Sequence, residues 1–188
     1  PARDDFPATI YPDFTLYSPC ISIISSRGCP LGCVFCTDRH VIYNSALYRM
    51  RDPNKVVNEM EYCINKYGAK QFYFDDQSIV VNKKHITGIC REILNRNIKI
   101  PWTCMGDSVF VNYETVKIMA EAGCVGMKFG VESASSEILN RINKPLSLEK
   151  VKQVVKWCRE LGIRTHATFC IGLPGETAET VSYTHLRA

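Results

Sequence analysis

Three features are scarce in this 188-residue sequence: long apolar runs, an excess of one charge, and any secretion signal. No apolar stretch approaches the ~20 residues that a membrane-spanning helix needs, so we expect no membrane span. The net charge is only +4 and the lysines and arginines are scattered, so no nucleic-acid partner is indicated. The amino-terminal residues show no basic-then-apolar pattern. Ten cysteines without secretion features are typical of reduced thiols, so we expect a cytoplasmic protein.

The composition is that of an ordinary globular domain. A hydrophobic content of 46% and a charged content of 22% are average values, and the length suits one domain with a real core. Seven of the ten cysteines fall within strand or helix patterns and are predicted to be small buried hydrophobic residues: Cys20, Cys63, Cys90, Cys104, Cys124, Cys158 and Cys170.

The most distinctive stretch is residues 25–36, which read SSRGCPLGCVFC. It follows the apolar run of residues 21–24, which is typical of a short buried strand. Gly28, Pro30 and Gly32 prevent a helix or a strand from continuing, so the stretch is predicted to be a loop that folds back on itself. A loop of this length can direct three thiolates at one small object.

The three cysteines of this loop, Cys29, Cys33 and Cys36, have the spacing C-x-x-x-C-x-x-C. An iron–sulfur cluster normally takes four cysteine ligands, and a structural zinc ion takes four ligands. Three close cysteines without an evident fourth favour a [4Fe–4S] cluster with one iron left open for a ligand that is not protein. A zinc site that uses His40 as its fourth ligand, and a disulfide framework, stay open as alternatives. A complete ferredoxin-type cluster would need a fourth cysteine in its own spacing.

This spacing, with the aromatic Phe35 before the last cysteine, resembles the signature of the radical S-adenosylmethionine superfamily. Residues 27–36 are similar to the branch whose members often carry an N-terminal cobalamin-binding domain, and the resemblance covers about residues 1–177. It implies an enzyme in which the three cysteines bind a [4Fe–4S] cluster and S-adenosylmethionine is cleaved reductively. The resulting 5′-deoxyadenosyl radical would abstract hydrogen from a substrate.

The resemblance also implies partners beyond the chain itself. These are an electron donor such as flavodoxin or ferredoxin, a small-molecule or lipid-like substrate, and cobalamin bound by an upstream domain. Two other classes of function stay open: an iron–sulfur electron-transfer protein and a zinc-stabilised binding module.

Strand-like and helix-like segments alternate along the chain. Strands are predicted at residues 21–24, 71–74, 101–105, 125–131 and 163–171, with amphipathic helices between them. Asp52-Pro53 is a helix start, Gly68 is a stop, and Ser147 begins the helix that Gly162 ends. Such alternation favours a parallel sheet with right-handed crossovers. The fold class is therefore α/β, and the resemblance implies a partial (β/α) barrel with about five of six β/α units.

Unusual residues follow the strands, and in parallel β/α folds sites form at the carboxyl ends of the strands. By resemblance, Asp75 and Asp76 receive the methionine amino group, while Glu132 and Ser133 lie near the nucleotide and methionine moieties. Helix caps or a solvated loop stay open as the alternative for the two aspartates. Three further residues are predicted to bind the cofactor, with core packing or a plain turn as their alternatives: Phe35, Ile171 and Gly172.

The ends of the chain have their own predicted roles. Residues 1–19 are proline-rich and predicted to be an extended arm or linker, residues 20–180 to be a truncated radical S-adenosylmethionine core, and residues 181–188 to be a foreign tail. Asp107 stands near a position where many relatives carry arginine. Arg141 and Lys144 are interpreted as part of a solvated helix face rather than as ligands of the methionine carboxylate.

Overall fold

The computed structural model describes residues 3–5 and 17–187. Most of the predicted amino-terminal arm, including Pro1, Pro7 and Pro12, lies outside the described residues. Five parallel strands form one sheet in the order β1-β4-β5-β6-β7. They are β1 (Cys20–Ile23), β4 (Gln71–Phe74), β5 (Trp102–Met105), β6 (Cys124–Glu132) and β7 (Arg164–Phe169). The predicted parallel α/β fold is therefore confirmed, and because β1 and β7 are opposite edges, the barrel is not closed.

The predicted helix starts at Asp52 and Ser147 and the predicted stop at Gly68 are confirmed. The helices follow the strands along the chain. They are α1 (Pro53–Tyr67), α2 (Lys83–Asn95), α3 (Tyr113–Glu121), α4 (Ser136–Arg141), α5 (Leu148–Glu160) and α6 (Ala178–Arg187). The side chain of Asp52 accepts a hydrogen bond from Lys55 N, which satisfies a free amide at the start of α1. Gly68 ends this helix with φ 65°, a left-handed conformation that suits glycine. Ser147 caps α5 in the same manner as Asp52 caps α1.

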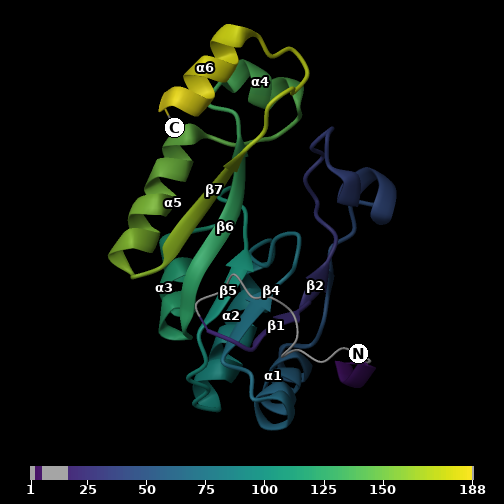
Figure 1. Cartoon of the computed structure of the whole chain (residues 1–188), viewed down its shortest axis with the longest axis vertical. Coiled ribbons are helices and arrows are strands. Elements are labelled where there is room, and N and C mark those ends of the chain that lie inside the picture. The colour runs from purple at the N-terminus through teal and green to yellow at the C-terminus, as the bar shows by residue number, and fades with distance from the viewer. Residues whose placement is uncertain (1–2, 6–16, 188) are drawn as a thin grey trace.

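The hydrophobic core lies between the sheet and one layer of helices, α1, α2, α3 and α5 (Figure 1). Alternation along each strand sends one set of side chains into this core. Phe72, Phe74, Trp102 and Phe129 are fully or almost fully buried there, and the rings of Phe74 and Trp102 meet edge to face at 5.2 Å. The other set of side chains faces away from these helices, and it is this second face that remains open. No helix among the described residues is long and apolar enough to cross a membrane.

Three short elements around the cysteine loop were not predicted. Strand β2 (Ser26–Arg27) pairs antiparallel with β3 (Arg49–Met50), and η2 (Asp38–Ile42) is a single π-helical turn. The cysteine loop thus follows β2 rather than β1 directly. At the other end of the chain, α6 occupies part of the segment predicted to be a foreign tail, and its Thr184 is buried. The foreign origin of that tail stays a prediction.

Candidate functional site

The cysteine loop is fastened to two distant parts of the chain. The backbone N–H of Gly28 donates to Oε1 of Gln77 at 2.9 Å, just beyond β4. On the other side, Val34 N donates to the carbonyl of Ile142 at 3.0 Å, and Asn143 Nδ2 donates to the carbonyl of Gly32 at 3.0 Å. The loop is therefore fixed by the units that contain β4 and α4.

Gly28 is required at its position for two reasons. Its φ of 90° lies in the left-handed region, and a Cβ atom there would stand 2.0 Å from the carbonyl oxygen of Leu47. The backbone of the segment that carries β3 therefore packs directly against the residue that precedes Cys29.

The three thiols of the loop share one partly dehydrated environment. Cys33 is buried, and Cys29 and Cys36 are partly buried. Burial raises the pKa of Cys33 to about 11, with Lys144 opposing the shift and Asp107 and the other two cysteines adding to it. Burial is also the main cause of the raised pKa of Cys29. Cys36, Asp107 and Lys144 act on the thiols of both Cys29 and Cys33, so these groups lie near one another.

The disulfide alternative does not agree with the structure, because all ten cysteines are free. The zinc alternative also finds no support. The Nε2 atom of His40 lies 3.0 Å from the carbonyl oxygen of Cys33, so this ring is hydrogen-bonded to the loop backbone. Within residues 3–5 and 17–187, no three His, Cys, Asp or Glu side chains are grouped closely enough to hold a metal ion.

The donor set fits an iron–sulfur cluster better than a single ion. Zinc requires its ligands around one point at about 2.0–2.3 Å, whereas thiolates of a four-iron cluster each bind a different iron and need not meet at a point. Three thiols spaced along one loop are consistent with the second arrangement.

The two aspartates after β4 point in different directions. Asp76 is 1% exposed, and its carboxylate accepts hydrogen bonds from the backbone N–H and the hydroxyl groups of both Ser25 and Ser26. His85 Nε2 lies 3.2 Å from the Ser25 hydroxyl and completes this buried group. Burial raises the pKa of Asp76 and lowers that of His85. The side chain of Asp76 therefore anchors the junction of β1 and β2, whereas Asp75 is exposed.

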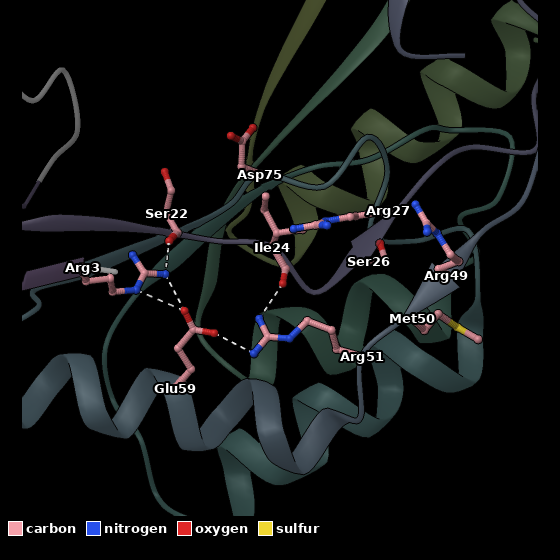
Figure 2. Close-up of a pocket in the computed structure, with 10 residues that line it drawn as sticks. All are labelled: Arg3, Ser22, Ile24, Ser26, Arg27, Arg49, Met50, Arg51, Glu59 and Asp75. Carbon is pink, nitrogen blue, oxygen red and sulfur yellow. Dashed lines mark hydrogen bonds and ion pairs between the residues drawn. The ribbon is translucent and has the colours of Figure 1, made fainter. Parts of the chain in front are cut away.

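Asp75 faces a cavity of about 660 Å³ beside the β1 edge of the sheet, shown in Figure 2. Arg3 and Arg51 both form ion pairs with Glu59 of α1, at 2.5 and 2.7 Å. The same guanidinium groups donate to the Ser22 and Ile24 carbonyls, which lie along the open edge of β1. This arrangement covers an edge strand that would otherwise leave its carbonyl groups unpaired.

Glu132 takes part in a buried charge cluster that the sequence did not predict. Lys144 Nζ lies 3.1 Å from Oδ2 of Asp107 and 3.6 Å from Oε1 of Glu132, and all three residues are 6–7% exposed. Burial alone would lower the pKa of Lys144, but the two carboxylates raise it. The prediction that Lys144 lies on a solvated helix face is therefore wrong, while Arg141 is exposed as predicted. A lone lysine between an asparagine and a proline gave no signal of burial.

Glu132 has further features that suit a ligand-binding position. Its φ of 69° is in the left-handed region, which is uncommon for a side chain other than glycine. Cys170 Sγ lies 3.0 Å from its Oε2 atom. The neighbouring Ser133 is fully buried and its hydroxyl lies 3.2 Å from that of Thr184 in α6, so this side chain holds α6 rather than facing the cysteines.

The remaining predicted cofactor residues form an exposed rim. Ile171 is 72% exposed and Phe35 is 39% exposed, although both are large apolar side chains. Gly172 has φ 87°, and its backbone N–H and that of Leu173 donate to Oε2 of Glu176 at 2.6 and 2.9 Å. Glu176 thus shapes the turn after β7. Ile171 and Gly172 lie just beyond the carboxyl end of β7, whereas Phe35 lies in the cysteine loop. The contacts of these residues with a cofactor stay a prediction.

Comparison with known proteins gives consistent matches. The family model of the Radical SAM superfamily matches residues 23–186. The chain is 33% identical over 162 residues to an uncharacterized methyltransferase of Pyrococcus horikoshii, covering 86% of this chain and 35% of the relative. It is 34% identical over 168 residues to the anaerobic magnesium-protoporphyrin IX monomethyl ester cyclase of Cereibacter sphaeroides, covering 87% of this chain and 27% of the relative.

Among solved structures, the radical S-adenosylmethionine methyltransferase TsrM from Kitasatospora setae, with tryptophan substrate and a SAM analog bound, superposes with a TM-score of 0.79 at 25% identity. The match covers 88% of this chain and 33% of TsrM. A second TsrM structure holds cobalamin and a [4Fe–4S] cluster. The chain thus spans about a third of the length of the relatives it matches.

Proposed function

Because this chain belongs to the radical S-adenosylmethionine superfamily, a family of enzymes that use a [4Fe–4S] cluster and S-adenosylmethionine, we propose that Cys29, Cys33 and Cys36 hold that cluster. The observation that carries this proposal is the loop itself. Three thiols with the family spacing share one partly buried region, and the loop is fastened by β/α units far apart in the sequence. A fourth protein ligand would not be needed if S-adenosylmethionine completes the cluster.

The cluster held by Cys29, Cys33 and Cys36 would supply the electron for reductive cleavage of S-adenosylmethionine, and so the radical chemistry on the substrate. The chain's own residues bind and orient. Glu132 offers a buried carboxylate oxygen to the amino group or ribose hydroxyls of the cofactor. Phe35 and Ile171 offer exposed apolar surface to the adenine, next to a turn preformed by Glu176. Asp75 is better placed than the Asp76 side chain to receive a ligand, since Asp76 is already fully hydrogen-bonded.

The finer reaction is proposed from the relatives. They include methyltransferases and a ring-forming cyclase, and a structural neighbour holds cobalamin. We infer that the whole protein transfers a methyl group or forms a ring on a small-molecule or lipid-like substrate, with cobalamin bound outside this chain. The electron would come from a flavodoxin or ferredoxin.

Anaerobic preparation and reconstitution of the chain test the cluster assignment. We expect about four iron and four sulfide per chain, a loss of both in Cys33→Ala, and retention of both in the matched control Cys20→Ala. Zinc without sulfide would refute the assignment. S-adenosylmethionine should alter the electron paramagnetic resonance spectrum of the reduced cluster. An unchanged spectrum would instead favour an electron-transfer protein.

A further inference from the structure

A second cavity, of about 380 Å³, opens on the face of the sheet that α1, α2, α3 and α5 do not cover. The register of the strands explains its composition. Tyr73 pairs with Thr103, Thr103 with Gly126, and Gly126 with Arg164, so these residues form one row across four strands. One step further along, Lys128 pairs with His166. Paired residues of neighbouring parallel strands project to the same face.

Gly126 creates the hollow in this surface. A Cβ atom at this position would lie 3.0 Å from Cγ2 of Thr103 and would occupy the space between Thr103 and Arg164. The missing side chain leaves a depression between the methyl group of Thr103 and the backbone carbonyl of Arg164, which lies 3.8 Å from the position of that Cβ atom. Lys128 borders it from the middle of the sheet, since β6 has β5 and β7 as neighbours on its two sides.

The charge of the cavity has one sign. Lys128, Arg164 and His166 line it, and no aspartate or glutamate does. In the part of the chain that the structure describes, none of these three side chains forms an ion pair or a side-chain hydrogen bond. Lys144, the other lysine near the sheet, is by contrast paired with two carboxylates. Solvated cations are common on open surfaces, but here they line a cavity together with three hydroxyl-bearing residues, Tyr73, Thr103 and Thr165.

We propose that this cavity binds an anionic oxygen group of the substrate, a carboxylate or a phosphate, through Lys128, Arg164 and His166. This inference rests on the proposed function, because it treats the open face of the sheet as the substrate side. Charge-assisted hydrogen bonds from lysine and arginine are the strong contacts for such groups. Tyr73 and Thr103 add hydroxyl donors at the other end of the cavity.

The position of the cavity sets the length of the substrate. Lys128 precedes Glu132 by four residues on β6, which corresponds to about 13 Å along an extended strand. An anionic group held at Lys128 therefore points the rest of a substrate toward the carboxyl end of the sheet. A substrate that reaches from Lys128 to the neighbourhood of Glu132 would need to be on the order of 10 Å long.

Binding of two simple probes to the full 188-residue chain tests this site. Inorganic pyrophosphate and succinate are titrated separately by isothermal calorimetry at constant ionic strength. We expect saturable binding of at least one probe, weakened about tenfold or more in Lys128→Gln. The matched control Lys152→Gln removes the same charge from the exposed side of α5 and should stay within about twofold. Tighter binding of pyrophosphate would indicate a phosphate-bearing substrate, and tighter binding of succinate a carboxylate.

Equal weakening in Lys128→Gln and Lys152→Gln, or no saturable binding of either probe, would overturn the inference. Arg164→Gln serves as a second variant if Lys128→Gln does not fold, because Arg164 is exposed. The iron and sulfide content of each protein separates this test from that of the proposed function. If the chain holds no iron or sulfide after reconstitution but binds a probe in a Lys128-dependent manner, the cluster assignment fails and the anion site stands. If the chain holds a complete cluster but binds neither probe, the anion site fails and the cluster assignment stands.

Discussion

The buried lysine at the candidate site gives the most direct test of the structure. Lys144 lies between Asp107 and Glu132, and the three side chains are 6–10% exposed. Lys144→Met keeps most of the aliphatic stem, so the packing changes little, but it leaves two buried carboxylates without a cation. Breaking a buried ion pair by removing one partner costs about 3–5 kcal/mol. We expect the lower end, about 3 kcal/mol, since the contact with Glu132 is long at 3.6 Å.

Urea unfolding followed by circular dichroism measures this change. For a chain of this size, about 3 kcal/mol corresponds to a decrease in melting temperature of about 6–12 °C. Lys152→Met, which removes an exposed lysine paired only with Glu149, should change the free energy of unfolding by less than about 0.5 kcal/mol. Asp107→Asn added to Lys144→Met removes one stranded charge, and its Oδ1 atom can still accept from Val109 N. This double variant should regain about half of the loss. A loss below about 1 kcal/mol, or no regain, would refute the assignment of a buried ion cluster.

Three further predictions concern the frame around the cysteine loop. Asp76→Ala leaves four buried hydrogen-bond donors of Ser25 and Ser26 unpaired. It should lower the free energy of unfolding, measured in urea, by about 3 kcal/mol or more. A change below about 1 kcal/mol would contradict the anchoring role of Asp76. Gly28→Ala should lower iron incorporation far more than Gly68→Ala. Both glycines have positive φ, but only at Gly28 would an added Cβ atom collide with backbone. Equal iron contents in the two variants would contradict this prediction. Burial alone would raise the pKa of Glu59, but Arg3 and Arg51 hold it below 4.5. The stability that this ion pair gives over Glu59→Gln should therefore be present above the ordinary pKa of glutamate and be lost as the pH falls through the lowered pKa of the folded state, as unfolding midpoints at several pH values would show.

The strand and helix pattern was predictable because it depends on local signals. Apolar periodicity located all five strands of the parallel sheet, and the caps at Asp52 and Ser147 located two helix starts. The cysteine spacing led to the correct family, because three ligands within eight residues constrain a loop without help from the rest of the chain.

The parts that were not predicted depend on contacts between distant residues. Strands β2 and β3 have two residues each, too few for any periodicity. They pair across more than twenty residues of sequence, and Arg51 N donates to the Ser25 carbonyl beside them. The burial of Lys144 results from Asp107, 37 residues earlier, and no local pattern encodes that distance. Likewise, the sequence could place Asp75 and Asp76 at a strand end, but the contacts of Asp76 with Ser25 and Ser26 depend on how β1 and β4 pair.

These long-range contacts imply that cluster binding depends on the whole sheet. The loop holds Cys29, Cys33 and Cys36 in a short stretch, yet its backbone is fixed by Gln77 on one side and by Ile142 and Asn143 on the other. A peptide containing only the loop residues would keep the three cysteines but lose the hydrogen bonds that orient them. Metal binding that requires a folded site adds its free energy to folding. The free energy of unfolding should therefore be larger for the chain with a cluster than for the chain without one. If the contact of Asn143 alone set the loop geometry, Asn143→Ala would abolish this gain in stability. Because three contacts fix the loop, we expect Asn143→Ala to keep most of the stability that the cluster adds. A complete loss of that added stability would show that the contact of Asn143 alone fixes the loop.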